Sequence, residues 1–277
     1  MTSVPDLTLN NGVTIPQLGF GVFQIPPDAT RKATLTALEV GYRHVDTAQM
    51  YGNEAGVGQA VRDSGLDRGD VFVTSKLNNS FHAYDDALAA FDKSLAELEF
   101  EYLDLFLVHW PMPAVGNFVE TWRAMEEIYR SGRSKAIGVS NFQPNHLDRL
   151  RAETDVVPAV NQVEVHPYFT QQDVRSYGVE HGIVTEAWSP IAQGKVLDDP
   201  TIGRIAKRYG KTPAQVTLRW HIQRGDVVFP KSATRSRVQE NFAIFDFELA
   251  DDDVTDISLL DREERIGPHP DKFNAMP

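Results

Sequence analysis

Residues 71–110 read VFVTSKLNNS FHAYDDALAA FDKSLAELEF EYLDLFLVHW. Two short apolar runs, Val71–Leu77 and Leu103–Trp110, are rich in β-branched and aromatic residues and are typical of buried strands. Between them, Tyr84–Leu98 places its apolar residues at helical spacing, which predicts an amphipathic helix. A strand, a helix and a second strand in this order indicate a βαβ unit with parallel strands.

The same alternation continues along almost the whole chain. The predicted strands are Leu18–Phe23, His44–Thr47, Val71–Leu77, Leu103–Trp110, Ala136–Ser140, Val160–Val165, Val184–Trp188 and Val227–Lys231. The predicted helices are Asp28–Val40, Glu54–Ser64, Tyr84–Leu98, Val119–Ser131, Asn145–Ala152, Gln171–His181 and Pro213–Arg224. Eight strands alternating with helices in 277 residues favour an α/β fold, the closed (β/α)8 or TIM barrel.

An open, doubly wound sheet is the competing α/β architecture. It usually carries a glycine-rich phosphate fingerprint in its first βα turn, whereas here Gly19-Phe20-Gly21 leads to Gln24 where the third glycine should be. The closer match, residues 56–61, follows no strand and lies inside a predicted helix. We therefore expect residues 1–277 to form a single barrel domain.

Two segments lie outside the repeat. Leu7–Pro16, with Asn10-Asn11-Gly12 between two apolar runs, predicts a β-hairpin that closes the barrel floor. Arg262–Pro277 has no periodicity and predicts a long C-terminal surface loop.

The composition excludes several classes of protein. With 27 basic and 39 acidic residues, the net charge of −12 repels a phosphate backbone, so we expect no nucleic-acid partner. The absence of cysteine excludes disulfides, thiolate zinc sites and a cysteine nucleophile. No signal-peptide pattern and no stretch of 18 apolar residues is present, and we expect a cytoplasmic protein without a membrane span.

Four polar side chains stand at the carboxyl ends of the second, third and fourth strands, where barrels of this kind place their active sites. They are Asp46, Tyr51, Lys76 and His109. Taken alone, Asp46 is explained by a helix N-cap and His109 by a hydrogen-bonded core histidine. Their shared position predicts that all four converge on one barrel mouth.

Of the four residues, Lys76 is the hardest to explain by a purely structural role. It closes an apolar strand, and a buried ammonium is costly unless a carboxylate pairs with it. Asp46, on the neighbouring strand, lies at the level needed to supply that carboxylate. Such an ammonium would favour the phenolate of Tyr51 and lower its pKa, which makes Tyr51 a candidate general acid for protonating a carbonyl oxygen.

Several segments together resemble the aldo-keto reductase family. They are Asp46-Thr47-Ala48-Gln49-Met50-Tyr51-Gly52-Asn53-Glu54, Lys76, Val108-His109-Trp110-Pro111, Gly138-Val139-Ser140-Asn141-Phe142 and Pro230-Lys231-Ser232. Within the family, Val157–Gln162 and Lys211–Gln215 are most similar to the bacterial branch that contains the 2,5-diketo-D-gluconate reductases. The resemblance covers nearly the whole chain, in order.

The resemblance implies NADPH-dependent reduction of a carbonyl group to an alcohol. Tyr51 would be the general acid, tuned by Lys76 and Asp46, and His109 would orient the carbonyl. The expected cofactor-binding residues are Trp188, against which the nicotinamide stacks, and Ser140, Asn141 and Gln162, which hold its carboxamide.

The loops after the seventh and eighth strands are where barrel enzymes often bind phosphate. Here they contain Ser189 and Gln193, and the basic stretch Lys231–Arg237. Three cations and three hydroxyls within Lys231–Arg237 predict an anion site. The resemblance implies that Lys231, Ser232 and Arg237 bind the adenosine 2′-phosphate of NADPH, and that Glu240 and Asn241 contact the adenine side.

One position departs from the family pattern. The related reductases generally follow the active-site lysine with Leu-Trp, whereas this chain has Leu77-Asn78. Asn78, Phe23, Trp110 and the tail around 266–273 are candidate substrate-pocket residues. The substrate itself stays open among diketo sugar acids, dicarbonyls such as methylglyoxal, and simple aldehydes.

Three alternatives remain open at this stage. A metal-dependent hydrolase barrel could use His44, Asp46, His109, Glu164 and His166 as ligands. A Schiff-base aldolase could use Lys76, and a sensing module could bind the cofactor with little turnover. The reductase hypothesis needs no metal, and we expect a monomer whose partner is a small carbonyl substrate.

Overall fold

The computed structural model describes residues 4–114 and 117–276. Within them, eight parallel strands form one sheet in the order β10-β9-β8-β7-β6-β5-β4-β3. The strands are β3 (Phe20–Gly21), β4 (His44–Asp46), β5 (Phe72–Leu77), β6 (Leu103–Val108), β7 (Ser134–Ser140), β8 (Val160–Glu164), β9 (Val184–Trp188) and β10 (Val227–Val228). The backbone N–H of Gly19 donates to Val228 O at 2.7 Å, which joins the two ends of the sheet and confirms the predicted (β/α)8 barrel.

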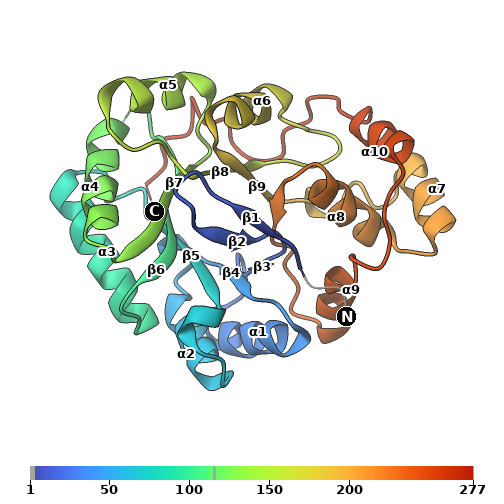
Figure 1. The fold of residues 1–277 in the computed structure, drawn as a ribbon, viewed down its shortest axis with the longest axis horizontal. Coiled ribbons are helices and arrows are strands. Elements are labelled where there is room, and N and C mark those ends of the chain that lie inside the picture. Colours follow the sequence, from blue (N-terminus) through green and yellow to red (C-terminus); the bar gives the residue numbers. More distant parts are fainter. Residues whose placement is uncertain (1–3, 115–116, 277) are drawn as a thin grey trace.

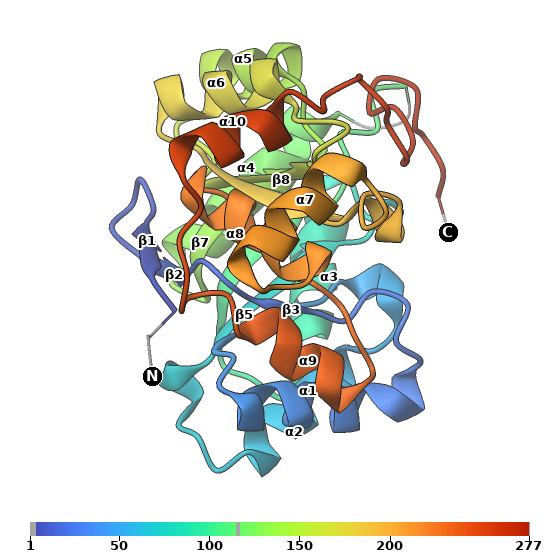
Figure 2. The ribbon, with the colours of Figure 1, turned by 90° about the vertical axis from the view of Figure 1, so that its right-hand side faces the viewer.

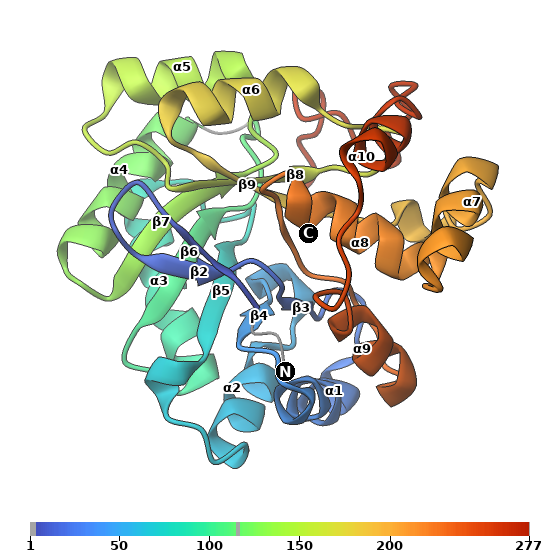
Figure 3. The same cartoon turned by 45° about the vertical axis from the view of Figure 1, so that its right-hand side comes forward.

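The helices lie around the outside of the strands (Figures 1 and 3). They are α1 (Pro27–Val40), α2 (Glu54–Asp63), α3 (Tyr84–Leu98), α4 (Phe118–Arg130), α5 (Pro144–Glu153), α6 (Gln172–His181), α7 (Pro200–Tyr209), α8 (Pro213–Gln223), α9 (Arg235–Phe242) and α10 (Asp251–Ser258). The seven predicted helices are present, with ends shifted by no more than one residue. The additional helices are α7, α9 and α10, and none of the described helices is long and apolar enough to cross a membrane.

The two ends of the barrel are covered differently. The predicted hairpin is confirmed as β1 (Asp6–Thr8) paired with β2 (Thr14–Pro16), and its Leu9 and Ile15 are buried against the first halves of the strands. Figure 2 shows this hairpin and the C-terminal tail on opposite sides of the molecule. The hairpin therefore seals one end, and the carboxyl ends of the strands lie beneath the tail.

The tail contains no helix or strand over residues 262–276, as predicted, but it is anchored by specific contacts described below. Pro277, the last residue of the predicted loop, lies outside the described residues.

Candidate active site

A buried ion pair lies where β4 and β5 end. Asp46 is the last residue of β4, and the parallel register pairs it with Thr74, so Lys76 lies two residues farther along β5. Lys76 Nζ donates to both carboxylate oxygens of Asp46, at 2.8 and 2.9 Å, and to the carbonyl oxygen of Thr47 at 2.8 Å. The side chain of Lys76 is 0% exposed, so the pair is shielded from water.

Tyr51 meets this pair from the short helix η1 (Gln49–Tyr51), which follows β4. Its hydroxyl oxygen lies 3.4 Å from Lys76 Nζ. The Tyr51 ring packs against His109, with ring centroids 5.9 Å apart, and against Phe23 at 5.0 Å. The structure thus brings together the four polar residues singled out in the sequence, with Phe23 beside them.

The pKa values of Tyr51, Lys76 and His109 are all shifted by burial and by neighbouring charges. Burial raises the pKa of Tyr51 above its ordinary value, and the opposing pull of Lys76 does not reverse the shift, so the lowered pKa expected from the sequence is wrong. Burial alone would lower the pKa of Lys76, but Asp46 and Tyr51 raise it. Burial, reinforced by Lys76, holds the pKa of His109 well below its ordinary value. At neutral pH Lys76 is charged, while Tyr51 and His109 are neutral.

A set of amide and hydroxyl groups lines the ends of β7, β8 and β9. Asn141, with a left-handed backbone (φ 64°), donates to the carbonyl oxygen of His109 at 3.0 Å and accepts from Trp188 Nε1 at 2.9 Å. The Ser140 hydroxyl donates to the backbone oxygen of Gln162 at 2.8 Å. These bonds tie the half-buried Trp188 ring to the strand ends next to His109.

The basic segment after β10 differs from the expected loop, because Arg235 to Arg237 form the first turn of α9. Arg235 is committed to an ion pair with Glu39 at 2.6 Å. Among the described residues, Lys231 and Arg237 are exposed and form no ion pair, and Ser232 is buried beside them. Two exposed cations next to a helix N-terminus give this acidic protein a local concentration of positive charge.

The remaining cofactor residues predicted from the sequence lie on α9 and in the loop after β9. Glu240, on α9, accepts a hydrogen bond from Thr212 Oγ1 at 2.7 Å, and Asn241 is half-buried next to it. Ser189 and Gln193, in the loop after β9, have left-handed backbones with φ of 50° and 54°.

The C-terminal tail is fastened over the strand ends by Glu164, the last residue of β8. Its carboxylate accepts from the backbone N–H groups of Ile266 at 2.6 Å and Gly267 at 2.8 Å, and it contacts His166 Nε2 at 3.0 Å. A Cβ on Gly267 would come within 2.4 Å of the Trp188 ring, so the tail backbone touches that ring where only glycine fits. The sequence suggested Glu164 and His166 as metal ligands and missed this anchoring role.

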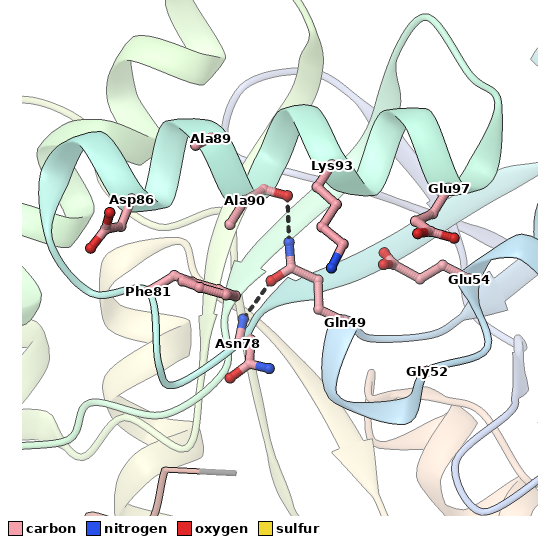
Figure 4. A pocket seen from close by; sticks show the side chains of 10 residues that line it. All are labelled: Gln49, Gly52, Glu54, Asn78, Phe81, Asp86, Ala89, Ala90, Lys93 and Glu97. Atoms are coloured by element: carbon pink, nitrogen blue, oxygen red, sulfur yellow. Dashed lines mark hydrogen bonds between the residues drawn. The ribbon is translucent and has the colours of Figure 1, made fainter.

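The two other candidate pocket residues, Trp110 and Asn78, follow the ends of β6 and β5. Trp110 packs against the tail residue Phe273, with ring centroids 4.3 Å apart. Asn78 borders a cavity of about 360 Å³ between η1 and α3, and its backbone N–H donates to Gln49 Oε1 at 2.7 Å (Figure 4). The rest of the lining is mixed: charged side chains of α2 and α3, among them Lys93, lie beside the apolar Phe81, Ala89 and Ala90.

The geometry gives the metal-hydrolase alternative no support. Both ring nitrogens of His44 are bonded, Nδ1 to Pro16 O at 3.2 Å and Nε2 to Thr74 Oγ1 at 3.1 Å. Across residues 4–114 and 117–276, no group of three or more His, Asp or Glu side chains could hold a metal ion. The Schiff-base alternative is also disfavoured, because a nucleophilic amine must be neutral and Asp46 keeps Lys76 protonated.

One buried acid in the barrel was missed by the sequence reasoning. Glu186, on β9, is 0% exposed, and its Oε2 accepts from Gln162 Nε2 at 2.7 Å. The sequence did contain a signal that Glu186 lies near the cofactor residues. Glu186 and Trp188 are two residues apart on one strand, so both side chains face the same side of the sheet.

Comparisons with known proteins agree with the resemblance seen in the sequence. The model of the Aldo/keto reductase family matches residues 17–262. An aldo-keto reductase of Mycolicibacterium smegmatis is 51% identical over 270 residues, which are 98% of each chain. Methylglyoxal reductase DkgA of Escherichia coli is 46% identical over 272 residues, covering 97% of this chain and 98% of its own.

A solved structure agrees equally well. A mutant of Gox0644 in complex with NADPH has a TM-score of 0.95 and 44% sequence identity, over 98% of this chain and 99% of its own. The match extends over both the barrel and the strand-end residues described above. This chain belongs to the aldo/keto reductase family.

Proposed function

We propose that the protein reduces the carbonyl group of a small aldehyde, ketone or dicarbonyl to the alcohol, with NADPH as its cofactor. The observation that carries the proposal is the Tyr51 hydroxyl held 3.4 Å from an ammonium that Asp46 pairs at 2.8 Å. Bound NADPH supplies a hydride to the carbonyl carbon. The similarity to a methylglyoxal reductase supports dicarbonyls as the first substrates to test, followed by diketo sugar acids and simple aldehydes.

Tyr51 protonates the carbonyl oxygen in this proposal. Because its pKa is raised, the phenol is fully protonated at neutral pH and holds a proton to give. The negative charge that develops on the substrate oxygen and on Tyr51 is stabilised by the Lys76 ammonium. Asp46 keeps that ammonium charged and fixed in place.

His109 orients the substrate as a neutral imidazole. Its Nδ1 is buried without a hydrogen-bond partner among the described residues, which leaves Nε2 for the substrate oxygen. A neutral ring with its proton on Nε2 donates a hydrogen bond to the carbonyl without bringing a second positive charge next to Lys76.

The cofactor residues fit NADPH by their chemistry. Lys231 and Arg237 are exposed cations without an ion-pair partner among the described residues, beside the N-terminus of α9, as a 2′-phosphate site requires. We assign Ser140, Asn141 and Gln162 to the nicotinamide carboxamide and Trp188 to the face of its ring. Ser189 and Gln193 complete the phosphate side, and Glu240 and Asn241 the adenine side.

The test is NADPH binding followed by turnover. NADPH fluorescence titration should give saturable binding, and NADPH consumption should occur with methylglyoxal or another carbonyl of the panel. Tyr51→Phe should lower kcat by about 10²–10⁴-fold and leave the Kd for NADPH within about twofold, because only the proton donor is removed. Tight binding without turnover on any carbonyl would favour a sensing module, and substantial turnover in Tyr51→Phe would contradict the role of Tyr51.

We also propose that the protein is a cytoplasmic, monomeric, single-domain enzyme. The large exposed apolar side chains of the described residues come from five separate segments of the chain, which supports a monomer. They are Phe23, Val157, Val179, Leu259 and Met276. One sedimenting species of monomer mass and one cooperative unfolding transition are expected, and a dimer or two transitions would contradict this proposal.

A further inference from the structure

The buried carboxyl of Glu186 has no role in the proton and hydride transfers proposed above. It lies inside the barrel on β9, where its sheet neighbours in register are Gln162 on β8 and Val227 on β10. One oxygen, Oε2, accepts from Gln162 Nε2 at 2.7 Å. The other, Oε1, is buried without a hydrogen-bond partner among the described residues.

Gln162 is held at the nitrogen end of its side-chain amide by two acids. Its Nε2 donates to Glu186 Oε2 at 2.7 Å and to Asp46 Oδ2 at 2.9 Å. An amide nitrogen has two hydrogens, and each carboxyl takes one of them. An amide oxygen at this position would face both carboxyl groups, so the two hydrogen bonds together keep Gln162 Oε1 turned away from both acids.

The charges around Glu186 are consistent with a neutral carboxyl that accepts a hydrogen bond from Gln162. The charged groups that act on Glu186 are Asp46 on β4 and Lys76 on β5, while its neighbours Gln162 and Val227 are uncharged. Burial, reinforced by Asp46, raises the pKa of Glu186 to about 8, so this carboxyl is mostly neutral at pH 7. Asp46 therefore remains the negative partner of Lys76, and Glu186 acts as a hydrogen-bond acceptor.

We propose that Glu186 is a positioning residue of the reductase: it fixes the Gln162 amide so that Oε1 can accept an N–H of the nicotinamide carboxamide. This inference rests on the proposed function, because it takes Gln162 as a carboxamide ligand. Glu186 itself touches neither cofactor nor substrate. Its effect passes through one hydrogen bond, from Gln162 Nε2 to Glu186 Oε2.

The test uses two variants of the full-length protein and two cofactors. Glu186→Leu removes one of the two acceptors and leaves the Gln162 amide held by Asp46 alone, so that Oε1 is less narrowly oriented, whereas Glu186→Gln keeps an acceptor oxygen at the same place. The cofactors are NADP⁺ and its 3-acetylpyridine analogue, which has a methyl ketone in place of the carboxamide and therefore no N–H to donate. Dissociation constants are measured by quenching of tryptophan fluorescence.

We expect Glu186→Leu to weaken NADP⁺ binding about tenfold, the cost of one oriented hydrogen bond, and to change binding of the acetylpyridine analogue less than twofold. Glu186→Gln should bind both cofactors within about twofold of the unmodified protein. Equal weakening of both cofactors by Glu186→Leu, or no weakening of either, would overturn the inference. Failure of the unmodified protein to bind NADP⁺ or NADPH would instead overturn the proposed function.

Unfolding of the cofactor-free variants in urea separates positioning from structural damage. Glu186→Leu replaces a buried carboxyl by an apolar side chain of similar size, so its midpoint should equal or exceed that of the unmodified protein. A lower midpoint together with equal loss of both cofactors would assign Glu186 a purely structural role.

Discussion

Lys76 carries its charge where water does not reach it, and its pairing with Asp46 therefore matters for folding as well as for the chemistry proposed above. Taking an ammonium out of water costs several kcal/mol, which only a close carboxylate and further acceptors offset. Asp46 supplies two oxygens and Thr47 a carbonyl, all within 2.9 Å of Nζ. The ammonium that acts on Tyr51 is thus part of the barrel interior.

Asp46→Asn should destabilise the protein by about 3–5 kcal/mol, because it leaves the buried charge of Lys76 without a carboxylate. The matched control is Asp256→Asn, which breaks the Arg204–Asp256 pair, whose two side chains are 49% and 45% exposed. That change should cost about 0–1 kcal/mol. Urea unfolding of both variants at pH 7 provides the comparison, and similar losses would show that the Asp46–Lys76 pair adds no special stability.

The positions of the proposed catalytic side chains were predictable because a simple rule governs them. Carboxyl ends of parallel strands meet at one end of a barrel, so Asp46, Lys76 and His109 had to lie close together. The pKa of Tyr51 was not predictable, because its direction depends on the balance between burial and the Lys76 charge. The sequence gives no measure of how deeply a side chain is buried.

At the scale of elements, the first turn of α9 contains two arginines, of which Arg235 forms an ion pair with Glu39 and Arg237 is exposed. Arg237→Ala should weaken NADPH binding at least tenfold and NADH binding much less, because only NADPH has the 2′-phosphate. The matched control is Arg235→Ala, because Arg235 is already paired with Glu39 at 2.6 Å and should affect both cofactors little. Fluorescence titrations measure all four affinities, and equal weakening of NADPH and NADH by Arg237→Ala would contradict the phosphate assignment.

The tail crosses Trp188 at Gly267, where there is no room for a side chain. Gly267→Ala should destabilise the protein by about 1–3 kcal/mol and increase proteolytic cleavage within 262–276, because a Cβ would lie 2.4 Å from the Trp188 ring. Gly203→Ala on α7 is the control. No atom lies within 4 Å of its added Cβ, so it should stabilise by about 0.5–1 kcal/mol. Equal protease resistance of the two variants would argue against the close contact.

Helix α9 was not predicted because its sequence lacks the signal that prediction relies on. Val238 is its only buried residue, so no apolar stripe marks it as helical. Strongly amphipathic helices such as α3 and α4 were predicted almost to the residue, because several of their side chains pack against the barrel. Likewise, no sequence pattern indicated that a carboxylate at the end of β8 would bind the tail.

At the scale of the whole molecule, buried histidines make stability depend on pH. Burial lowers the pKa of His44 and of His82 to about 4 each, and holds that of His109 well below its ordinary value. As pH falls from about 6.5 toward 4, the unfolded chain binds protons that the folded protein excludes, so the free energy of unfolding decreases. Burial also lowers the pKa values of His146 and His221. Glu54 and Glu186, whose pKa values burial raises, oppose this trend, but they are two carboxyl groups against five histidines.

Urea unfolding at pH 7 and pH 5 measures this dependence, with lower stability expected at pH 5. His82→Phe should reduce the decrease in the free energy of unfolding by up to about 1.4 kcal/mol per pH unit, because phenylalanine cannot bind a proton in the unfolded chain. An unchanged pH dependence in His82→Phe would mean that His82 titrates normally in the folded protein.

The contact that closes the barrel also sets the order in which the chain can finish folding during synthesis. Gly19 and Gln17 bond to Val228, so the first strand of the barrel sheet to be synthesised must wait for the last one, β10. Until residue 228 leaves the exit tunnel, β3 has β4 as its only strand neighbour and exposes an open sheet edge. A nascent chain stalled before that point keeps two such edges and is prone to pair with other chains, whereas release of the complete chain lets both edges meet.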